Sequence, residues 1–449
     1  MADTEQDSTE DSTRQDIADQ DIDGFFSTAR VSGQAEAVTL PTDSYREFLF
    51  DRDDPVLAEW RGMSYDEFTA ARQQNPFLRE LLEYWNSLFA EPFVGVTSDG
   101  TVRDGLYRLP EAGASDPARR EAAEALLAAL SPDERATVSL PIDSPEWRGW
   151  SNPEFVFHRP GLRLENLTDD QVERVYALMA ATLSPEGYAR VREAMRLNGF
   201  LGELTELPTI MNERSYWFAL YGTPSDTAPW GWQLSGHHCD VNFVTVAGRD
   251  VIAPVFIGGE PALSDDEHEP LFAAREATAL ALAASFTAEQ RDAAVVYESV
   301  LDPAMPEGRL HPADERHVAG AFRDNRVVPY EGVNVTTFSA AQRALLREVV
   351  ADFFVLLQRG QREQTLADYD AHLDETWLSW YGATDGSQPF YLRIQSPVIL
   401  AELDHHAGVW LSNRLPARFH VHTTLRLPNG NDYAHAYLAE WQRQQQQHG

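Results

Sequence analysis

The chain has 449 residues, 43% of them hydrophobic, and carries 71 acidic against 36 basic residues, for a net charge of −35. This excess of negative charge argues against nucleic acid or an anionic membrane surface as a partner, because both are bound through clustered basic side chains. Every basic residue is an arginine. The absence of lysine excludes Schiff-base, pyridoxal-phosphate and P-loop chemistry.

The N-terminal segment, residues 1–35, is expected to be a disordered acidic tail, because it is polar and has no apolar stretch of the kind found in signal peptides. No later run approaches the roughly 20 apolar residues of a membrane span. With one cysteine, Cys239, no intrachain disulfide can form, and the cytoplasm is the expected compartment. We predict a single globular domain over residues 36–449.

Helices are predicted at several points along the chain. Residues 44–88 show the three- and four-residue spacing of apolar side chains that amphipathic helices have. Residues 91–110 alternate on either side of Ser98-Asp99-Gly100, which predicts a β-hairpin. Later helix starts carry a Ser or Thr followed three residues on by Glu or Gln, a capping pattern. These pairs are Ser131 with Glu134, Thr168 with Gln171, Thr287 with Gln290, and Ser339 with Gln342.

Two segments between the helical ones, residues 215–257 and 389–427, are expected to form a sheet. The second ends in "RFHVHTTLRL", where polar and apolar side chains alternate. The polar positions are Arg418, His420, His422, Thr424 and Arg426. A strand face with two imidazoles and two guanidiniums indicates a pocket and not a solvent-facing surface.

Histidines of the two segments are the predicted metal ligands. In "GHHCDVNF" the alternation places His238 on the polar side, and if the segments meet, His238, His420 and His422 converge. Asp404 or His237 would complete the set. Imidazole nitrogens with one carboxylate suit Fe, Cu or Zn, so we expect a divalent metal ion of uncertain identity as cofactor.

Charged side chains that share this face are the other site candidates. Glu402 and Asp404 are candidate catalytic groups that could serve as bases. Asp432 suits a turn or helix cap first, and is a secondary catalytic candidate. Arg393 and Arg426 are candidates for binding a small anionic substrate.

Several conspicuous residues also have a plain structural interpretation. Trp230 and Trp232 are core aromatics first and substrate-binding pocket walls second. Cys239 falls on the apolar side of its strand and is expected to be buried. The doublet His405-His406 is expected to be structural, and His435 to lie on the surface or in packing contacts of a C-terminal helix.

Four motifs carry a resemblance to a known family: "WRGWSNPEF", "GTPSDTAPWGWQLSGHHCDVNF", "PVFIGGEPA" and "HVHTTLRLPNGNDY". Together they resemble the domain of unknown function 3500 family of bacteria and fungi, from about Trp85 to the C-terminus. The resemblance implies that His237, His238, His420, His422 and Asp432 form the family's polar core. Cys239 departs from it, since an aliphatic residue is expected there. The family supplies no established reaction.

The expected fold is α+β, a mostly antiparallel sheet with one face lined by His, Arg and acidic side chains, wrapped by amphipathic helices. The expected function is that of a metal-dependent enzyme, leaning to a mononuclear non-haem iron or copper oxidoreductase acting on a small anionic molecule. A zinc hydrolase or lyase is the nearest alternative. A metal-free binding protein for an acidic small ligand is the alternative from another class.

Overall fold

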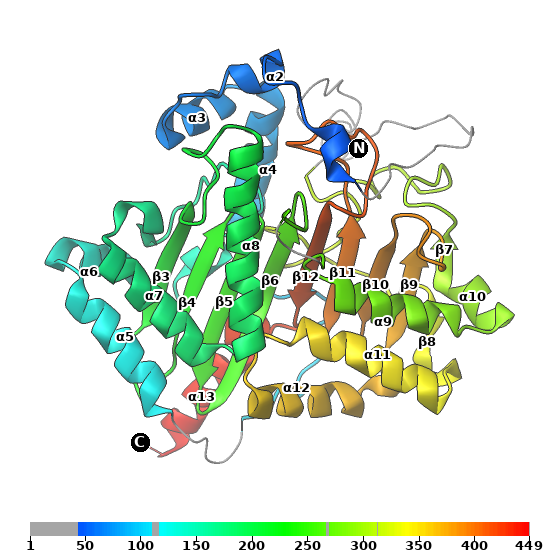
Figure 1. Cartoon of the computed structure of the whole chain (residues 1–449). Coiled ribbons are helices and arrows are strands. Elements are labelled where there is room, and N and C mark those ends of the chain that lie inside the picture. Colours follow the sequence, from blue (N-terminus) through cyan, green and yellow to red (C-terminus); the bar gives the residue numbers. More distant parts are fainter. Residues whose placement is uncertain (1–43, 110–115, 266–268, 312, 449) are drawn as a thin grey trace, which may run out of the picture.

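The computed structural model describes residues 44–109, 116–265, 269–311 and 313–448 (Figure 1). The predicted tail, residues 1–35, lies outside these ranges. Helices and one large sheet make the described part an α+β structure. None of the described helices is long and apolar enough to cross a membrane.

Groups of helices and groups of strands follow one another along the chain. The helices are η1 (Tyr45–Phe48), α2 (Pro55–Ala58), α3 (Tyr65–Arg72), α4 (Pro76–Ala90), α5 (Pro117–Ala129), α6 (Pro132–Val138), η2 (Pro145–Arg148), η3 (Leu164–Asn166), α7 (Asp169–Thr182), α8 (Pro185–Leu204), α9 (Ala273–Ala284), α10 (Ala288–Ala294), η4 (Val335–Thr337), α11 (Ala340–Phe353), α12 (Arg359–Ala371), η5 (Leu373–Glu375), η6 (Asp432–Ala434) and α13 (His435–His448). The strands are β1 (Ser139–Leu140), β2 (Leu162–Arg163), β3 (Tyr216–Gly222), β4 (Trp230–Gly236), β5 (Cys239–Val246), β6 (Arg249–Gly259), β7 (Val295–Tyr297), β8 (Val333–Asn334), β9 (Trp377–Tyr381), β10 (Tyr391–Gln395), β11 (Leu400–His405) and β12 (Val421–Arg426).

All twelve strands among the described residues belong to one mixed sheet. Its main order is β1-β3-β4-β5-β6-β12-β11-β10-β9-β7, with β2 on β3 and β8 on β9. The two predicted strand segments therefore meet, through the antiparallel pair β6–β12, which places Gly258 opposite His422. The prediction of a mostly antiparallel sheet has to be corrected, because β1 and β7 run parallel to β3 and β9. These two- and three-residue strands follow helices and are too short to show a period in the sequence.

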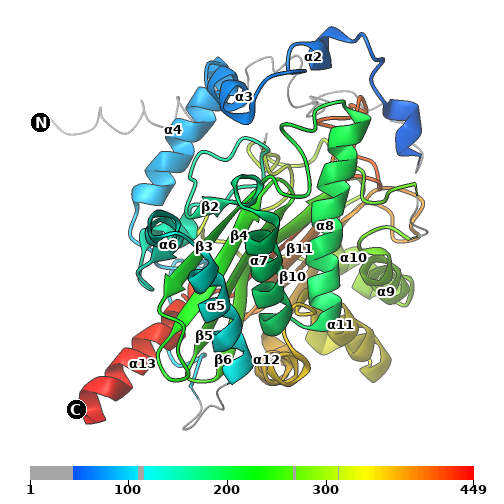
Figure 2. The ribbon, with the colours of Figure 1, turned by 60° about the vertical axis from the view of Figure 1, so that its left-hand side comes forward.

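The two faces of the sheet are covered differently. Helices α7, α8, α9 and α11 lie across one face (Figures 1 and 2), where Trp232 Nε1 donates to Thr182 Oγ1 of α7 over 3.0 Å. On the other face lies the segment 313–328, which has no helix or named strand among its residues. Its backbone N–H and C=O groups pair with Glu402 and Arg426. Irregular backbone has free polar groups, so it can satisfy buried charges that a helix would leave unpaired.

The sheet consists of two halves with the same order of elements, which the sequence patterns did not reveal. Residues 117–259 contain α5, α6, β1, β2, α7, α8 and β3–β6, and residues 273–426 repeat this order as α9, α10, β7, β8, α11, α12 and β9–β12. Gly161 and Gly332 occupy equivalent positions in the two halves. A Cβ on Gly161 would lie 2.0 Å from a carbonyl oxygen of β3, and a Cβ on Gly332 would lie 2.1 Å from a carbonyl oxygen of β9. The strand order places an approximate two-fold axis between β6 and β12.

Local sequence signals succeed at the helix starts and in the helical segment 44–88, which contains α3 and most of α4, but fail at the predicted hairpin. All four predicted capping boxes are confirmed, at the starts of α6, α7, α10 and α11, each with both hydrogen bonds. The predicted hairpin at 91–110 is wrong. Thr97 instead pairs with the distant segment around Val327, through hydrogen bonds to Arg326 and Val328. The backbone N–H and C=O of Thr97, which a hairpin would pair locally, are bonded to this distant segment.

Candidate metal centre

His237 and His238 form the two-residue turn that joins β4 to β5. The alternation pattern predicts both residues within a strand, and this prediction is wrong. The pattern misleads here because a two-residue turn is too short to interrupt the apparent period. His238 has a φ of 60°, a left-handed conformation that costs a non-glycine residue roughly 1–2 kcal/mol. Its carbonyl accepts from the N–H of Gly258 over 2.8 Å. The turn is thus tied to the end of β6, opposite His422 on β12.

His420 and His422 approach each other from one short stretch of chain. His420 directly precedes β12 and His422 lies within it. Their Nε2 atoms are 3.0 Å apart, and His420 Nδ1 is 2.7 Å from the carbonyl oxygen of Ala407. A carbonyl oxygen only accepts, so Nδ1 of His420 carries the proton and its Nε2 presents a lone pair. That lone pair accepts from His422 Nε2–H, so in the absence of a metal ion a hydrogen bond joins the two rings.

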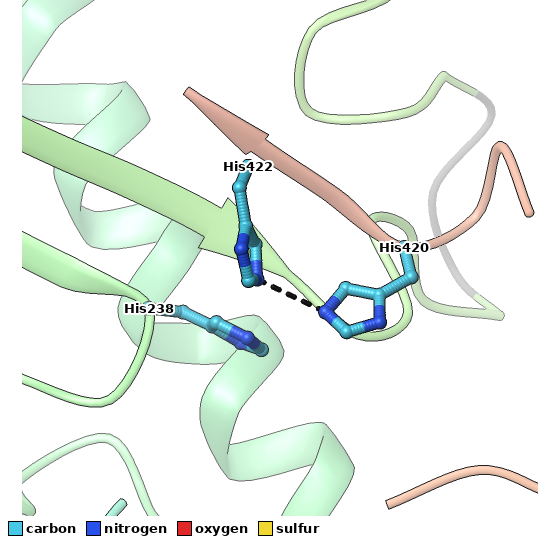
Figure 3. Close-up of side chains that lie close together, drawn as sticks. All are labelled: His238, His420 and His422. Carbon is cyan, nitrogen blue, oxygen red and sulfur yellow. Dashed lines mark hydrogen bonds between the residues drawn. The ribbon is translucent and has the colours of Figure 1, made fainter. Parts of the chain in front are cut away.

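The rings of His238, His420 and His422 converge on one point (Figure 3). One ring nitrogen from each lies within 4.8 Å of the other two, and none of the three residues is more than 3% exposed. Gly258 makes room for them, since a Cβ there would lie 2.6 Å from His422 Cδ2 and 3.4 Å from His238 Cδ2. The structure thus brings together the three histidines that the sequence predicts as ligands.

Burial keeps these imidazoles neutral. Loss of hydration lowers the pKa of His420 to about 3. Burial, with repulsion from neighbouring histidines, holds the pKa values of His238 and His422 well below the usual value. Neutral imidazole is the form that binds a metal ion, so none of the three rings has to lose a positive charge near neutral pH.

His237 lies beside this group and contacts His238. Its ring stacks on that of His238 with centroids 3.8 Å apart. Its Nδ1 lies 2.8 Å from Oδ1 of Asn198 on α8. The bond turns this nitrogen toward the helix-covered side, so the contacts of His237 are those of a group that positions His238. They do not place it in the set of three converging nitrogens.

A second group of metal-ligating type lies next to the first. It consists of His317, Asp404 and His406, whose ligand atoms also lie within 4.8 Å of one another. The rings of His406 and His422 have centroids only 3.9 Å apart. The sequence patterns do not identify His317, because it lies in an irregular loop without a period.

The two residues of the doublet His405-His406 differ in role: His405 has structural contacts, and His406 belongs to the second group of candidate ligands. His405 has structural contacts, since its Nδ1 lies 3.1 and 3.0 Å from the backbone N and O of Phe390. His406 lies one residue past the end of β11 and joins the second histidine group, which the structural interpretation of the doublet does not predict. His435 is exposed, with its ring against Phe93 as expected.

Glu402 and Asp404 are buried and already engaged. Glu402 accepts from the N–H of Val318 over 2.8 Å and from the hydroxyl of Tyr391 over 2.6 Å. Burial raises its pKa, but His317 and these hydrogen bonds more than offset that and bring it to about 2. Asp404 Oδ1 accepts from Arg316 Nε over 2.6 Å. Glu402 is therefore a weak base at neutral pH, and Asp404 forms an ion pair with the buried guanidinium of Arg316.

The remaining charged candidates form ion pairs away from the histidine rings. Arg426 Nη1 lies 2.5 Å from Asp324 and 3.1 Å from Asp432. Arg393 Nη2 lies 3.0 Å from Glu331. Burial raises the pKa of Asp432 to about 6, and Arg426 offsets only part of this rise. Its carboxylate accepts from the N–H of Leu427 and pairs with Arg426, which ties the segment after β12 to that strand. These contacts fit a structural role for all three candidates.

Trp230, Trp232 and Cys239 lie in the core. Trp232 faces α7 on the helix-covered side of the sheet, and Trp230 has the same orientation because it is two residues away on the same strand. This is the face opposite His422, so their position does not support the predicted pocket wall. Cys239 is fully buried, as expected, and burial raises the pKa of its thiol.

Comparison with known proteins finds a family but no characterised relative. The family model described as "Protein of unknown function (DUF3500)" matches residues 112–435, most of the chain. No curated protein and no solved structure matches. The match spans both halves of the sheet and all the histidines described above. The chain therefore belongs to the DUF3500 family.

Proposed function

We propose that the protein is a metal-dependent enzyme whose metal ion is held by His238, His420 and His422. The observation that carries this proposal is the close approach of His420 Nε2 and His422 Nε2, at 3.0 Å. Two nitrogens bound to one metal at about 2.1 Å each would be roughly 3.0–3.4 Å apart for bond angles of about 90–110°. The separation therefore fits two ligands of one ion.

Contacts around the rings support the same set. The carbonyl of Ala407 fixes the tautomer of His420, as outer-sphere acceptors do for metal-binding histidines. The backbone of Gly258 holds the turn that carries His238. A metal ion would also explain why His238 adopts a left-handed conformation, since local strain is often retained where geometry serves a site.

Redox chemistry with iron or copper is favoured over zinc hydrolysis. A hydrolase needs a base beside the metal-bound water, and the two predicted bases are poorly suited. Glu402 has a pKa of about 2, and Asp404 is paired with Arg316. When bound, an iron or copper ion would supply electron transfer to or from the substrate. The protein groups would position that ion and exclude bulk water.

The burial of the site favours a small substrate. His238, His420 and His422 are each at most 3% exposed, so any substrate must be small or must displace covering segments. The proposed anionic character of the substrate loses its basis, because Arg393 and Arg426 already pair with carboxylates. The same pairing weakens the metal-free binding protein, which relied on free arginines.

Metal content after reconstitution tests the proposal. The purified full chain would be incubated anaerobically with Fe(II) and, separately, with Cu(II) or Zn(II), desalted, and measured by elemental analysis. We expect at least one equivalent of iron or copper in the wild type, and the loss of one equivalent in a His420→Ala/His422→Ala variant. His435→Ala is a surface control, since this residue is exposed.

The two alternatives give different results in the same experiment. A wild type that retains none of the three metals would overturn the enzyme proposal. Retention of zinc alone would favour the hydrolase, and so would bound iron or copper that is not reduced and reoxidised on cycling between dithionite and air. Loss of metal from the His435→Ala control would show non-specific binding and would also count against the site.

A further inference from the structure

We infer that His317, Asp404 and His406 form a second metal site directly beside the first. The group offers two imidazole nitrogens and one carboxylate oxygen within 4.8 Å of one another, all from buried residues. These three residues share no ligand with the first group. The second site therefore does not depend on the proposed function, whereas any cooperation between two metals does.

Two nitrogens in this group lack the partners that buried nitrogens normally have. His317 Nε2 and His406 Nε2 are both buried and form no hydrogen bond, and His317 and His406 are only 2% and 3% exposed. Buried polar atoms without a partner are uncommon and call for an explanation. His406 Nε2 lies 3.1 Å from Asp404 Oδ2 without hydrogen-bonding geometry. A cation between these atoms would satisfy all of them.

The second ring nitrogen of each histidine faces an oxygen atom. His317 Nδ1 lies 2.8 Å from Thr424 Oγ1 and 3.7 Å from Glu402, which leaves Nε2 as its free donor atom. His406 Nδ1 lies 3.6 Å from Glu315. This is the arrangement of metal-binding histidines, whose second ring nitrogen faces a carboxylate or another oxygen.

Asp404 is oriented by the backbone and side chain of Arg316. Arg316 Nε donates to Oδ1 over 2.6 Å and its backbone N–H donates to Oδ2 over 3.2 Å. The carboxylate is thus fixed with Oδ2 toward His406. A buried carboxylate without a counter-charge would be costly, and Arg316 offsets part of that cost for Asp404.

The ligand set indicates the kind of metal. Two histidines and one carboxylate suit Fe(II), and also Mn or Zn. Three histidines suit Fe, Cu or Zn. Iron is the redox metal common to both sets. Because the rings of His406 and His422 lie 3.9 Å apart, two ions would be close neighbours, so we expect an iron pair when both sites are filled.

Metal stoichiometry of single variants tests this inference. The full chain would be loaded anaerobically with Fe(II) and analysed beside His317→Ala, His317→Gln and His420→Ala. We expect two equivalents in the wild type and one in each variant. His317→Gln keeps a side chain of similar length if the alanine variant does not fold. His405→Gln is the matched buried control and should retain two equivalents.

The outcomes separate this inference from the proposed function. One equivalent in the wild type, kept in both His317 variants and lost in His420→Ala, would overturn the second site and leave the first. One equivalent lost in the His317 variants but kept in His420→Ala would support the second site and overturn the first. No bound iron in the wild type would overturn both.

Electron paramagnetic resonance tests the pairing itself. After oxidation in air, two coupled Fe(III) ions should give far less signal than the iron content predicts, whereas the single Fe(III) in His317→Gln should give its full signal. A full signal from a wild type with two equivalents would overturn the pairing, although both sites would stand.

Discussion

The two halves of the sheet share one plan and differ at the turn between their two middle strands. In the first half this turn is His237-His238, and in the second it is Pro397-Val398. The first turn lies against Gly258 and the start of β12. The repeated elements therefore form the frame, and the candidate metal ligands lie at one end of the central strand pair β6–β12.

The two ends of β12 show what distinguishes a structural polar group from a candidate ligand. At the C-terminal end, Arg426 is saturated by Asp324, Asp432 and two backbone carbonyls. At the N-terminal end, His420 and His422 direct ring nitrogens at each other. The paired charges of Arg426 stabilise the fold, whereas neutral ring nitrogens that are hydrogen-bonded only to each other can still bind a metal ion.

The largest expected effect is on the saturated end. Arg426→Met would leave Asp324 and Asp432 buried without their cation, and should lower the free energy of unfolding by about 3–5 kcal/mol, measured by urea denaturation. Arg359→Ala, whose side chain is 87% exposed, should cost less than about 0.5 kcal/mol. A loss of under about 1 kcal/mol for Arg426→Met would contradict the structural role of this end.

The next prediction concerns the N-terminal end of β12 and uses a substitution that leaves every candidate ligand in place. Gly258→Ala would put a Cβ 2.6 Å from His422 Cδ2 and 2.9 Å from the carbonyl oxygen of Val421. We expect iron affinity to fall at least tenfold and stability to fall by about 1–3 kcal/mol, measured by metal competition and thermal unfolding. Gly259→Ala, whose nearest contact would be 3.1 Å, should retain iron. Equal affinities in the two variants would count against the site.

A third prediction uses a difference between equivalent helices of the halves. Asp352, the penultimate residue of α11, pairs with Arg190 and Arg275, each at 2.7 Å, whereas the corresponding residue of α7 is Ala181. Burial raises the pKa of Asp352, but the two arginines more than offset this and lower it to about 2 from 3.8.

Because its folded-state pKa is depressed, Asp352 stabilises the protein above pH 3.8, and this contribution is lost as the pH falls through about 2. Asp352→Asn should cost about 2 kcal/mol at pH 7, and this cost should begin to shrink only as the pH falls below 3.8 toward about 2. Calorimetric or urea unfolding from pH 7 to the lowest pH at which both proteins fold would measure it. A difference that stays constant with pH would show that the charge is not responsible.

The smallest effect concerns the strained turn. His238→Ala and His238→Gly should both lose the metal of the first site, yet the metal-free glycine variant should be more stable than the alanine variant by about 1 kcal/mol, because glycine adopts the left-handed conformation without a steric cost. Thermal unfolding of the two metal-free variants measures this difference. An alanine variant as stable as the glycine variant would show that the turn has relaxed to another conformation.

The local signals in the sequence predicted a good part of the helical structure. Capping pairs such as Thr168 with Gln171 depend on residues three apart, so the sequence alone identifies them. The alternation in β11 and β12 likewise predicted that Asp404 and His422 share a face, and the register pairs them directly. Such patterns are readable because each depends on contacts within one element or between adjacent strands.

What the sequence by itself determined was the α+β class, the helix starts and the identity of the three histidines that would converge if the two strand segments met. The tertiary structure alone decided that His317 and His406 stand beside them and that Arg426 is saturated. It also decided that the chain contains two equivalent halves. The physical reason is the same in each case: loops and paired charges have no period, so their partners are selected by long-range packing, which brings together groups far apart in the chain.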